Sequence, residues 1–348
     1  MNAQLDTFST LLIYGTIASY TVAMVAFATD LSGFGKGADP KRARKAVNIA
    51  MSTSWLGLGF HVVAVVLRAI AAERVPWANM YEFTLMSTMF TMLVFLVVNH
   101  FKDIRYLGVL ITLINITGLF MAILPLNVAA EGVQPALQSY WLVIHVSVAT
   151  LSTGLFCVAA AISLLQLLRG RDERQRESLQ DGQDAGPDAR RQAPASSRGA
   201  GGGALVAEQV RADTDEVVGM DLGGAEPQVA PARPTFWSRL LDAFPAAESL
   251  ERLAYRLNAV GLVGWTFVLI TGAIWAEYAW GRAWGWDPKE VVTLVVWLIY
   301  AAYCHVRLTT GWDKRTFAYF SLAGFAALMF NYYGVNIFIN SLHSYSGI

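Results

Sequence analysis

Cysteine and charge are the two properties that this chain has least of. Only two of its 348 residues are cysteine, Cys157 and Cys304, and they lie far apart in apolar runs. No CxxC or CxxCH occurs, which excludes a disulfide scaffold, a thiol-redox motif and a haem attached to this chain in c-type linkage. Charged residues make up 15% of the sequence and the formal net charge is zero. The charge therefore gives no indication of nucleic-acid binding.

The familiar motifs of soluble enzymes are also missing. The sequence has no glycine-rich phosphate loop, no H-E-x-x-H zinc motif, no Ser-His-Asp spacing and no internal repeat. Hydrophobic residues make up 55% of the chain, a composition typical of a membrane protein. Its five histidines and eleven tryptophans are left to carry the chemistry.

Long apolar runs predict an all-α fold, a polytopic bundle of about eight transmembrane helices. A helix crosses a bilayer with about 20 residues. The runs of that order lie at 8–29, 49–71, 82–99, 105–125, 140–168, 257–278, 289–308 and 316–339. No basic residue precedes the first run, so it lacks the usual form of a signal peptide, although Ala26-Phe27-Ala28 faintly resembles a cleavage site.

Basic residues predict the orientation of the bundle. They gather after the first, third, fifth and seventh runs, for example at Lys41–Lys45 and Arg169–Arg176. Cytoplasmic loops carry such an excess of lysine and arginine. Both termini are then extracytoplasmic, and the loop 279–288 shares the outer face with the tail 340–348.

Composition divides the chain into four parts. Residues 1–169 hold the first five membrane helices. Residues 170–233 consist mostly of Arg, Gly, Ala, Asp and Pro, which predicts a disordered cytoplasmic linker. Residues 234–256 predict an interfacial amphipathic helix, because five large apolar side chains fall on one helical face. Residues 257–348 hold the last three membrane helices.

A tryptophan-rich stretch opens the seventh helix. In WGRAWGWDPKE, Trp280, Trp284 and Trp286 fall within seven residues and are spaced by Gly281 and Gly285; Asp287 and Glu290 follow. The sequence DPKE is typical of a helix N-cap with a capping box, and tryptophans anchor proteins at membrane interfaces. Three indoles spaced by glycines also form a flat aromatic surface that a planar ligand can approach closely.

This stretch resembles the WWD signature of haem-handling membrane proteins. With its continuation LVVWLIYAAYCH and the ending NSLHSYSG, it is similar to the CcsA (ResC) family of system II cytochrome c biogenesis, whose members are named CcsB in some lineages. The resemblance covers most of the chain outside about 170–250. The segment Val75–Glu82 also resembles the family's P-x-x-N-x-Y-E sequence, although a Pro-Trp-Asn loop is equally a plain interfacial turn.

The resemblance implies how haem is held. His145, about one turn inside the fifth helix, and His343, in the tail, are expected to be the axial ligands of a haem b on the outer face. Trp280, Trp284, Trp286 and Asp287 are expected to shape the surrounding walls. Lys289 and Arg282 are candidates to bind the haem propionates.

A second, intramembrane haem site is implied at His305, near the cytoplasmic end of the seventh helix. Its other ligand is expected from a partner membrane subunit. His61 is the lesser candidate, because at 1.5 Å per residue its depth differs from that of His305 by about 10 Å or more. His100, at a cytoplasmic helix end, is expected to be solvated.

The expected function is that of the membrane subunit of the system II cytochrome c synthase in the bacterial plasma membrane, with a thylakoid membrane as the alternative. Such a subunit moves haem to the outer face and presents it to the CxxCH of apocytochrome c. Its partners would be a CcsB/ResB-like membrane subunit and a thioredoxin-like thiol reductant. Two other functions stay open: a haem transporter or chaperone without a ligase role, and a bis-histidine, cytochrome b-like electron carrier.

Overall fold

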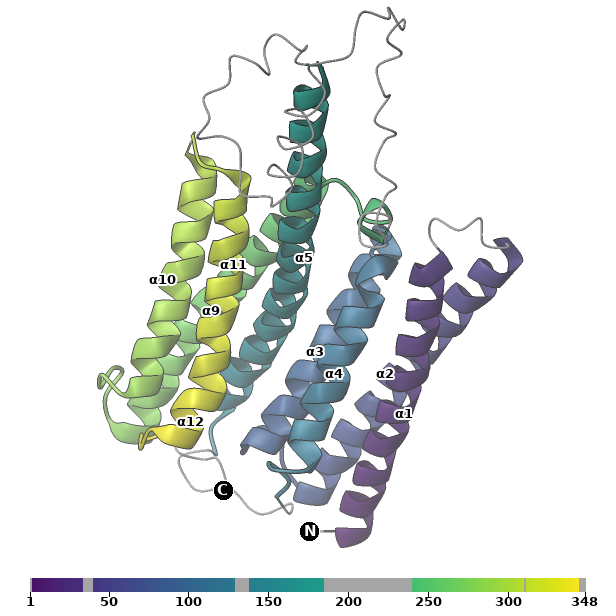
Figure 1. Cartoon of the computed structure of the whole chain (residues 1–348). Helices are drawn as coiled ribbons and strands as arrows, with labels where there is room; N and C mark the ends of the chain where they lie inside the picture. Colours follow the sequence, from purple (N-terminus) through teal and green to yellow (C-terminus); the bar gives the residue numbers. More distant parts are fainter. Residues whose placement is uncertain (1, 34–39, 129–137, 185–239, 310, 344–348) are drawn as a thin grey trace, which may run out of the picture. The chain divides into compact units, whose positions relative to one another are not determined.

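The structure is a computed structural model, and it describes residues 2–33, 40–128, 138–184, 240–309 and 311–343. These residues form helices and no strands (Figure 1). The elements are α1 (Ala3–Gly33), α2 (Pro40–Ala72), α3 (Met80–Phe101), η1 (Arg105–Leu107), α4 (Gly108–Ile123), α5 (Tyr140–Asp184), α9 (Ala247–Trp280), α10 (Pro288–Leu308), α11 (Lys314–Met329), η4 (Phe330–Gly334) and α12 (Val335–Phe338). The predicted all-α fold is confirmed.

Seven helices within the described ranges are long and apolar enough to cross a membrane. They correspond to the first seven predicted runs. The eighth run, 316–339, is divided between α11, the π-helical turn η4 and α12, which follow one another without a break from Lys314 to Phe338. Single π-helical turns often mark functional sites, and this one contributes Asn331 and Tyr332 to the cavity described below.

Two boundaries differ from the sequence prediction. Helix α5 continues to Asp184, so residues 170–184 of the predicted linker are helical. The rest of that linker, 185–233, lies outside the described residues. Helix α9 starts at Ala247 and runs unbroken to Trp280, across the predicted junction between an interfacial helix and a membrane helix. Of the described residues, those up to Arg171 and those from 240 onward form one compact unit, and 172–184 belong to a second. The features described below belong to the first unit.

Three clusters of buried side chains hold this unit together. The largest one packs α1 to α4 with the middle of α5 and the start of α9, around side chains such as Phe27 and Phe95. The second joins α5, α9, α10 and α11, and at its centre Phe156 stacks on Tyr300 with ring centres 3.8 Å apart. The third packs the start of α5 against Trp275 of α9. Gly154 allows α5 to approach α3, because a Cβ at this position would lie 2.9 Å from the backbone of Phe90.

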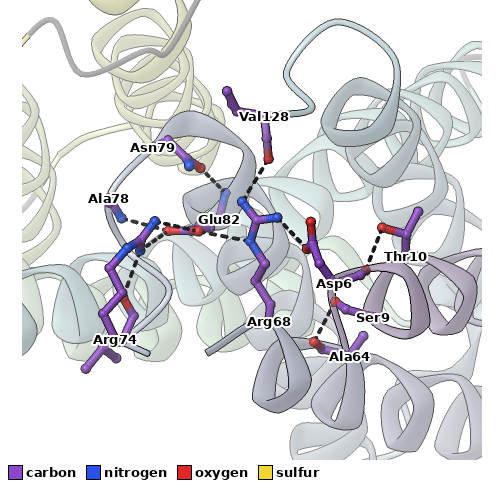
Figure 2. Close-up of polar contacts among 11 residues, drawn as sticks. Asp6, Ser9, Thr10, Ala64, Arg68, Arg74, Ala78, Asn79, Glu82 and Val128 are labelled. Carbon is purple, nitrogen blue, oxygen red and sulfur yellow. Dashed lines mark hydrogen bonds and ion pairs between the residues drawn. The ribbon is translucent and has the colours of Figure 1, made fainter. Parts of the chain in front are cut away.

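A buried ion network ties the N-terminal helices together (Figure 2). Arg68 on α2 is 1% exposed. Its guanidinium donates to Asp6 of α1 at 2.6 Å, to Glu82 of α3 at 3.1 Å and to the carbonyl of Val128 at 2.8 Å. Arg74 adds a second cation to Glu82 at 2.7 Å. Buried charges are tolerated only when they are paired, and in this network two arginines meet two carboxylates.

The same network fixes the turn before α3. Glu82 accepts the backbone N–H of Ala78 at 2.9 Å, and its own N–H donates to the N-cap side chain of Asn79 at 2.9 Å. The Pro76-Trp77 turn is therefore held by the carboxylate that also binds both arginines. This turn places Trp77 on the wall of the cavity described next.

Candidate functional site

A cavity of about 590 Å³ lies among α3, α4, α5, α9, α10 and η4. Ligand sites in proteins commonly have volumes of about 300–1,000 Å³. Aromatic and aliphatic side chains form most of its wall, and only a few polar groups converge on it. Its lining includes Trp77, His145, Trp275, Trp284, Lys289 and His343.

His343 is oriented by Asp287, the N-cap residue of α10. The Nδ1 of His343 lies 2.8 Å from the Asp287 carboxylate, whose other oxygen accepts the N–H of Leu342 at 2.9 Å. A carboxylate only accepts, so Nδ1 carries the proton and the neutral ring keeps a lone pair on Nε2. Burial holds the pKa of His343 below its usual value, and the hydrogen bond to Asp287 offsets part of that lowering. The ring is thus prepared to ligate a metal through Nε2.

His145 is oriented in the same manner by a backbone group. Its Nδ1 lies 2.9 Å from the carbonyl oxygen of Val268 on α9, which also only accepts. Gly272, one turn along α9, makes room for this imidazole, because a Cβ there would lie 2.8 Å from its Cε1 atom. The Nε2 of His145 is therefore the nitrogen with a free lone pair.

Trp275 links the two histidines. Its ring centre lies 6.4 Å from that of His145, with nearly parallel planes, and 5.6 Å from that of His343. Trp280 packs against Trp275 at 4.7 Å and against His343 at 4.8 Å. The structure thus brings His145 and His343, which lie far apart in the sequence, to one cavity.

Trp275 and Trp77 were missed by the sequence analysis. Trp275 precedes the tryptophan-rich motif by little more than one helical turn, so its closeness in sequence to that motif was the available signal. Trp77 lies in the Val75–Glu82 segment, for which two interpretations were open. Its place on the cavity wall favours the functional one.

The three motif tryptophans do not form one common platform. Trp280 packs on His343, and Trp284 lines the cavity. Trp286 is 73% exposed and does not line the cavity, although it meets Trp284 edge to face at 5.7 Å.

The two candidate propionate-binding residues, Lys289 and Arg282, lie in different surroundings. Lys289 lines the cavity, and its Nζ donates to the amide oxygen of Asn336 at 2.7 Å. Arg282 is exposed, and its guanidinium contacts Gly285 instead. Of the two, only Lys289 is placed to meet a negatively charged group inside the cavity.

The other predicted histidines lie away from this cavity. His61 is fully buried on α2, with its ring centre 6.4 Å from that of Tyr20 on α1. His305 is exposed on α10. Neither side chain lines the cavity, and His100 is exposed as expected.

Comparison with known proteins decides the family. Residues 77–343 match the model of the cytochrome c assembly proteins. The chain belongs to this family. The cytochrome c biogenesis protein CcsA of Nostoc punctiforme is 33% identical over 340 residues, which cover 92% of this chain and 94% of the relative. CcsA of Gloeobacter violaceus is 31% identical over 306 residues, with coverages of 83% and 86%.

The fold has a counterpart among solved structures. The cytochrome c haem lyase CcmF superimposes with a TM-score of 0.57 at 13% sequence identity. The superposition covers 94% of this chain and 46% of CcmF. This similarity concerns the helical membrane fold, whereas the CcsA relatives confirm the family predicted from the motifs. The chain is therefore a membrane protein of cytochrome c maturation, in a family that handles haem and apocytochrome.

Proposed function

We propose that the chain is the membrane subunit of a system II cytochrome c synthase, which presents haem b at the extracytoplasmic face of the bacterial plasma membrane. One observation supports this most strongly. His145 and His343 line one cavity beside a shared indole, and each has its Nδ1 engaged by an acceptor. Two neutral imidazoles with free Nε2 atoms suit the axial positions of a haem iron.

The neighbouring residues keep these ligands ready. Asp287 fixes the tautomer and ring direction of His343, and such outer partners also raise the basicity of a ligating imidazole. The Val268 carbonyl does the same for His145. Trp275 and Trp284 supply flat walls for the macrocycle, and Trp280 packs against Trp275 and His343.

Lys289 is the group on this wall that suits a haem propionate. Its side chain projects into the cavity near the carboxylate-anchored His343 and already binds one polar partner, Asn336. A carboxylate in place of that amide gives a charge-assisted hydrogen bond, which is the stronger type.

The chemistry of attachment belongs mainly to the substrates. Each cysteine thiol of the apocytochrome CxxCH adds across a haem vinyl group, so that a C–S bond forms and the thiol hydrogen ends on the other vinyl carbon. No electrons are gained or lost. The chain's own part is positioning, which places the reacting groups at high effective concentration.

A partner membrane subunit of the CcsB/ResB kind completes the proposal. His305 faces outward on α10, where a histidine of that subunit is able to reach it, and His61 stays the second candidate. A thioredoxin-like reductant keeps the apocytochrome thiols reduced. Tags at residue 200 and at the C-terminus are expected on opposite sides of the membrane, and finding both on one side contradicts this orientation.

Replacing each histidine by glycine tests the proposal. His145→Gly and His343→Gly are expected to remove outer-site haem and covalent cytochrome together, and added imidazole is expected to restore part of both. His100→Gly, at an exposed helix end, is the matched control and should retain full product. Full maturation by either variant without imidazole would contradict the assignment of His145 and His343 as haem ligands.

An assay of covalent product distinguishes a synthase from a haem chaperone. The chain is purified with its neighbouring subunit, and covalent haem on an added CxxCH apocytochrome is measured. Covalent product from this complex supports a synthase. Bound haem without any product favours the chaperone.

A further inference from the structure

Trp286 has a backbone conformation that tryptophan seldom takes. Its φ is +57°, in the left-handed region, and it shares this feature with only one other non-glycine residue among those described. Bulky residues are rare there, and such conformations cost on the order of 1–3 kcal/mol each. They persist when the surrounding structure holds them in place, and they concentrate at functional sites.

Glu290 holds Trp286 in this conformation. One carboxylate oxygen, Oε2, accepts the backbone N–H of Gly285 at 2.8 Å and that of Asp287 at 3.1 Å. These are the residues on either side of Trp286. The Glu290 carboxylate therefore bonds to the backbone on both sides of Trp286 and fixes its conformation, in which the Trp286 side chain is exposed.

A membrane anchor does not account for this arrangement. Interfacial tryptophans need only an exposed ring at the right depth. Trp312, in the loop between α10 and α11, is 52% exposed, and there the left-handed position is taken by Gly311 at φ +94°. The chain thus has an ordinary exposed tryptophan at one end of α10 and a clamped one at the other.

We propose that Trp286 is a docking residue for the haem-attachment segment of apocytochrome c, and that Glu290 is its positioning residue. This inference rests on the proposed function. The occupant follows from continuity with the cavity: Trp286 touches Trp284, and Trp284 lines the haem cavity. An unfolded polypeptide whose thiols reach the haem edge beside Trp284 contacts this pair of rings. Exposed aromatic residues of this kind often dominate the energy of protein interfaces.

The substitution Trp286→Gly tests this with little risk to folding, because glycine takes positive φ freely. The full complex is supplied with a CxxCH apocytochrome at increasing concentration, and the initial rate of covalent product is measured. The apocytochrome concentration that gives half the maximal rate should rise about tenfold, as for loss of an interface hot spot. Haem per protein and its optical spectrum should stay unchanged.

Two further variants sharpen the test. Glu290→Gln weakens the clamp and should shift the half-saturating concentration in the same direction by a smaller factor. Trp312→Gly is the matched control and should leave it unchanged. An equal shift in Trp312→Gly shows that both tryptophans are membrane anchors, and loss of haem in Trp286→Gly shows that the ring belongs to the haem site. Either result, or no shift in Trp286→Gly, overturns the proposal.

His145→Gly in the same assay distinguishes a failure of the proposed function from a failure of the docking role of Trp286. If that variant keeps haem and product, the proposed function fails whatever Trp286 does. If it loses haem while Trp286→Gly behaves like the wild type, only the docking role is wrong.

Discussion

The starts of α3 and α10 use the same capping chemistry in different surroundings. Glu82 and Glu290 each lie three residues after an N-cap residue, Asn79 and Asp287, and each carboxylate accepts a backbone N–H from the loop before its helix. Glu82 is completely buried and binds Arg68 and Arg74. No ion pair reaches Glu290 among the residues that the structure describes.

We propose that this difference separates a network that only supports the fold from one that serves the proposed haem site. At α3 every charge has a partner of opposite sign, so the network closes on itself and fixes three helices and the Trp77 turn. At α10 the hydrogen bonds end on His343 and on the backbone beside Trp286, both of which present free groups to a ligand. In this chain, the capping carboxylate at α3 binds two arginines, whereas those at α10 bind His343 and the backbone beside Trp286.

Removing a charge from the closed network should have the largest effect on folding. Arg68→Met leaves the Glu82 and Asp6 carboxylates without their main partner, and breaking a buried ion pair costs about 3–5 kcal/mol. We expect little protein in the membrane and a much lower melting temperature in detergent. Arg68→Lys retains the charge and should recover part of the loss, whereas normal levels of Arg68→Met would show that the network is dispensable.

A change at the start of α10 should affect haem binding rather than folding. Asp287→Asn keeps a residue that caps helices well, so stability should hardly change. Loss of the carboxylate beside His343 should reduce outer-site haem and covalent product by about 10–100-fold, as for other partners of metal ligands. The readout is haem and product per unit of protein.

Asp313→Asn is the control for that substitution, since Asp313 caps α11 in the same way, with Arg315 N–H at 3.0 Å, and does not line the cavity. Equal product from both variants would mean that Asp287 is only a helix cap.

Breaking an exposed ion pair should have a much smaller effect on stability than breaking the buried network. Arg105 and Asp103 meet at 2.6 Å, but their side chains are 34% and 62% exposed. Surface pairs contribute about 0–1 kcal/mol because water competes for both charges. Asp103→Asn should therefore shift the melting temperature only slightly and leave maturation intact. A loss as large as that of Arg68→Met would contradict the distinction between buried and exposed pairs.

Deleting residues 185–230 should have the smallest effect on activity. The deletion removes no predicted membrane run, no histidine and no tryptophan, and the segment consists mostly of Arg, Gly, Ala, Asp and Pro. Maturation is expected to persist, with at most a lower amount of protein. Inactive protein at a normal level would reveal a function in this segment.

Much of the fold could be predicted because its signals are local. Hydropathy over about 20 residues locates membrane helices, and the runs at 82–99 and 289–308 lie close to α3 and α10. The N-cap at Asp287 was likewise readable from DPKE, and the structure has that capping box. The family followed from a long motif, and the resemblance to that family also nominated His145 and His343. Helix lengths were less certain, because α5 and α9 run on through polar sequence.

By itself, the sequence determined the membrane helices, the family and the histidines worth testing, since each depends on neighbouring residues or on a continuous motif. Only the tertiary structure decided which groups meet. Arg68 pairs with Asp6 from α1, and Trp275 stands between histidines of α5 and the tail. It also decided that Trp284 lines the cavity of His145 and His343, whereas Trp286 does not. Such pairings join positions far apart in the chain, and the packing of whole helices brings them together, which no local pattern of apolar residues encodes.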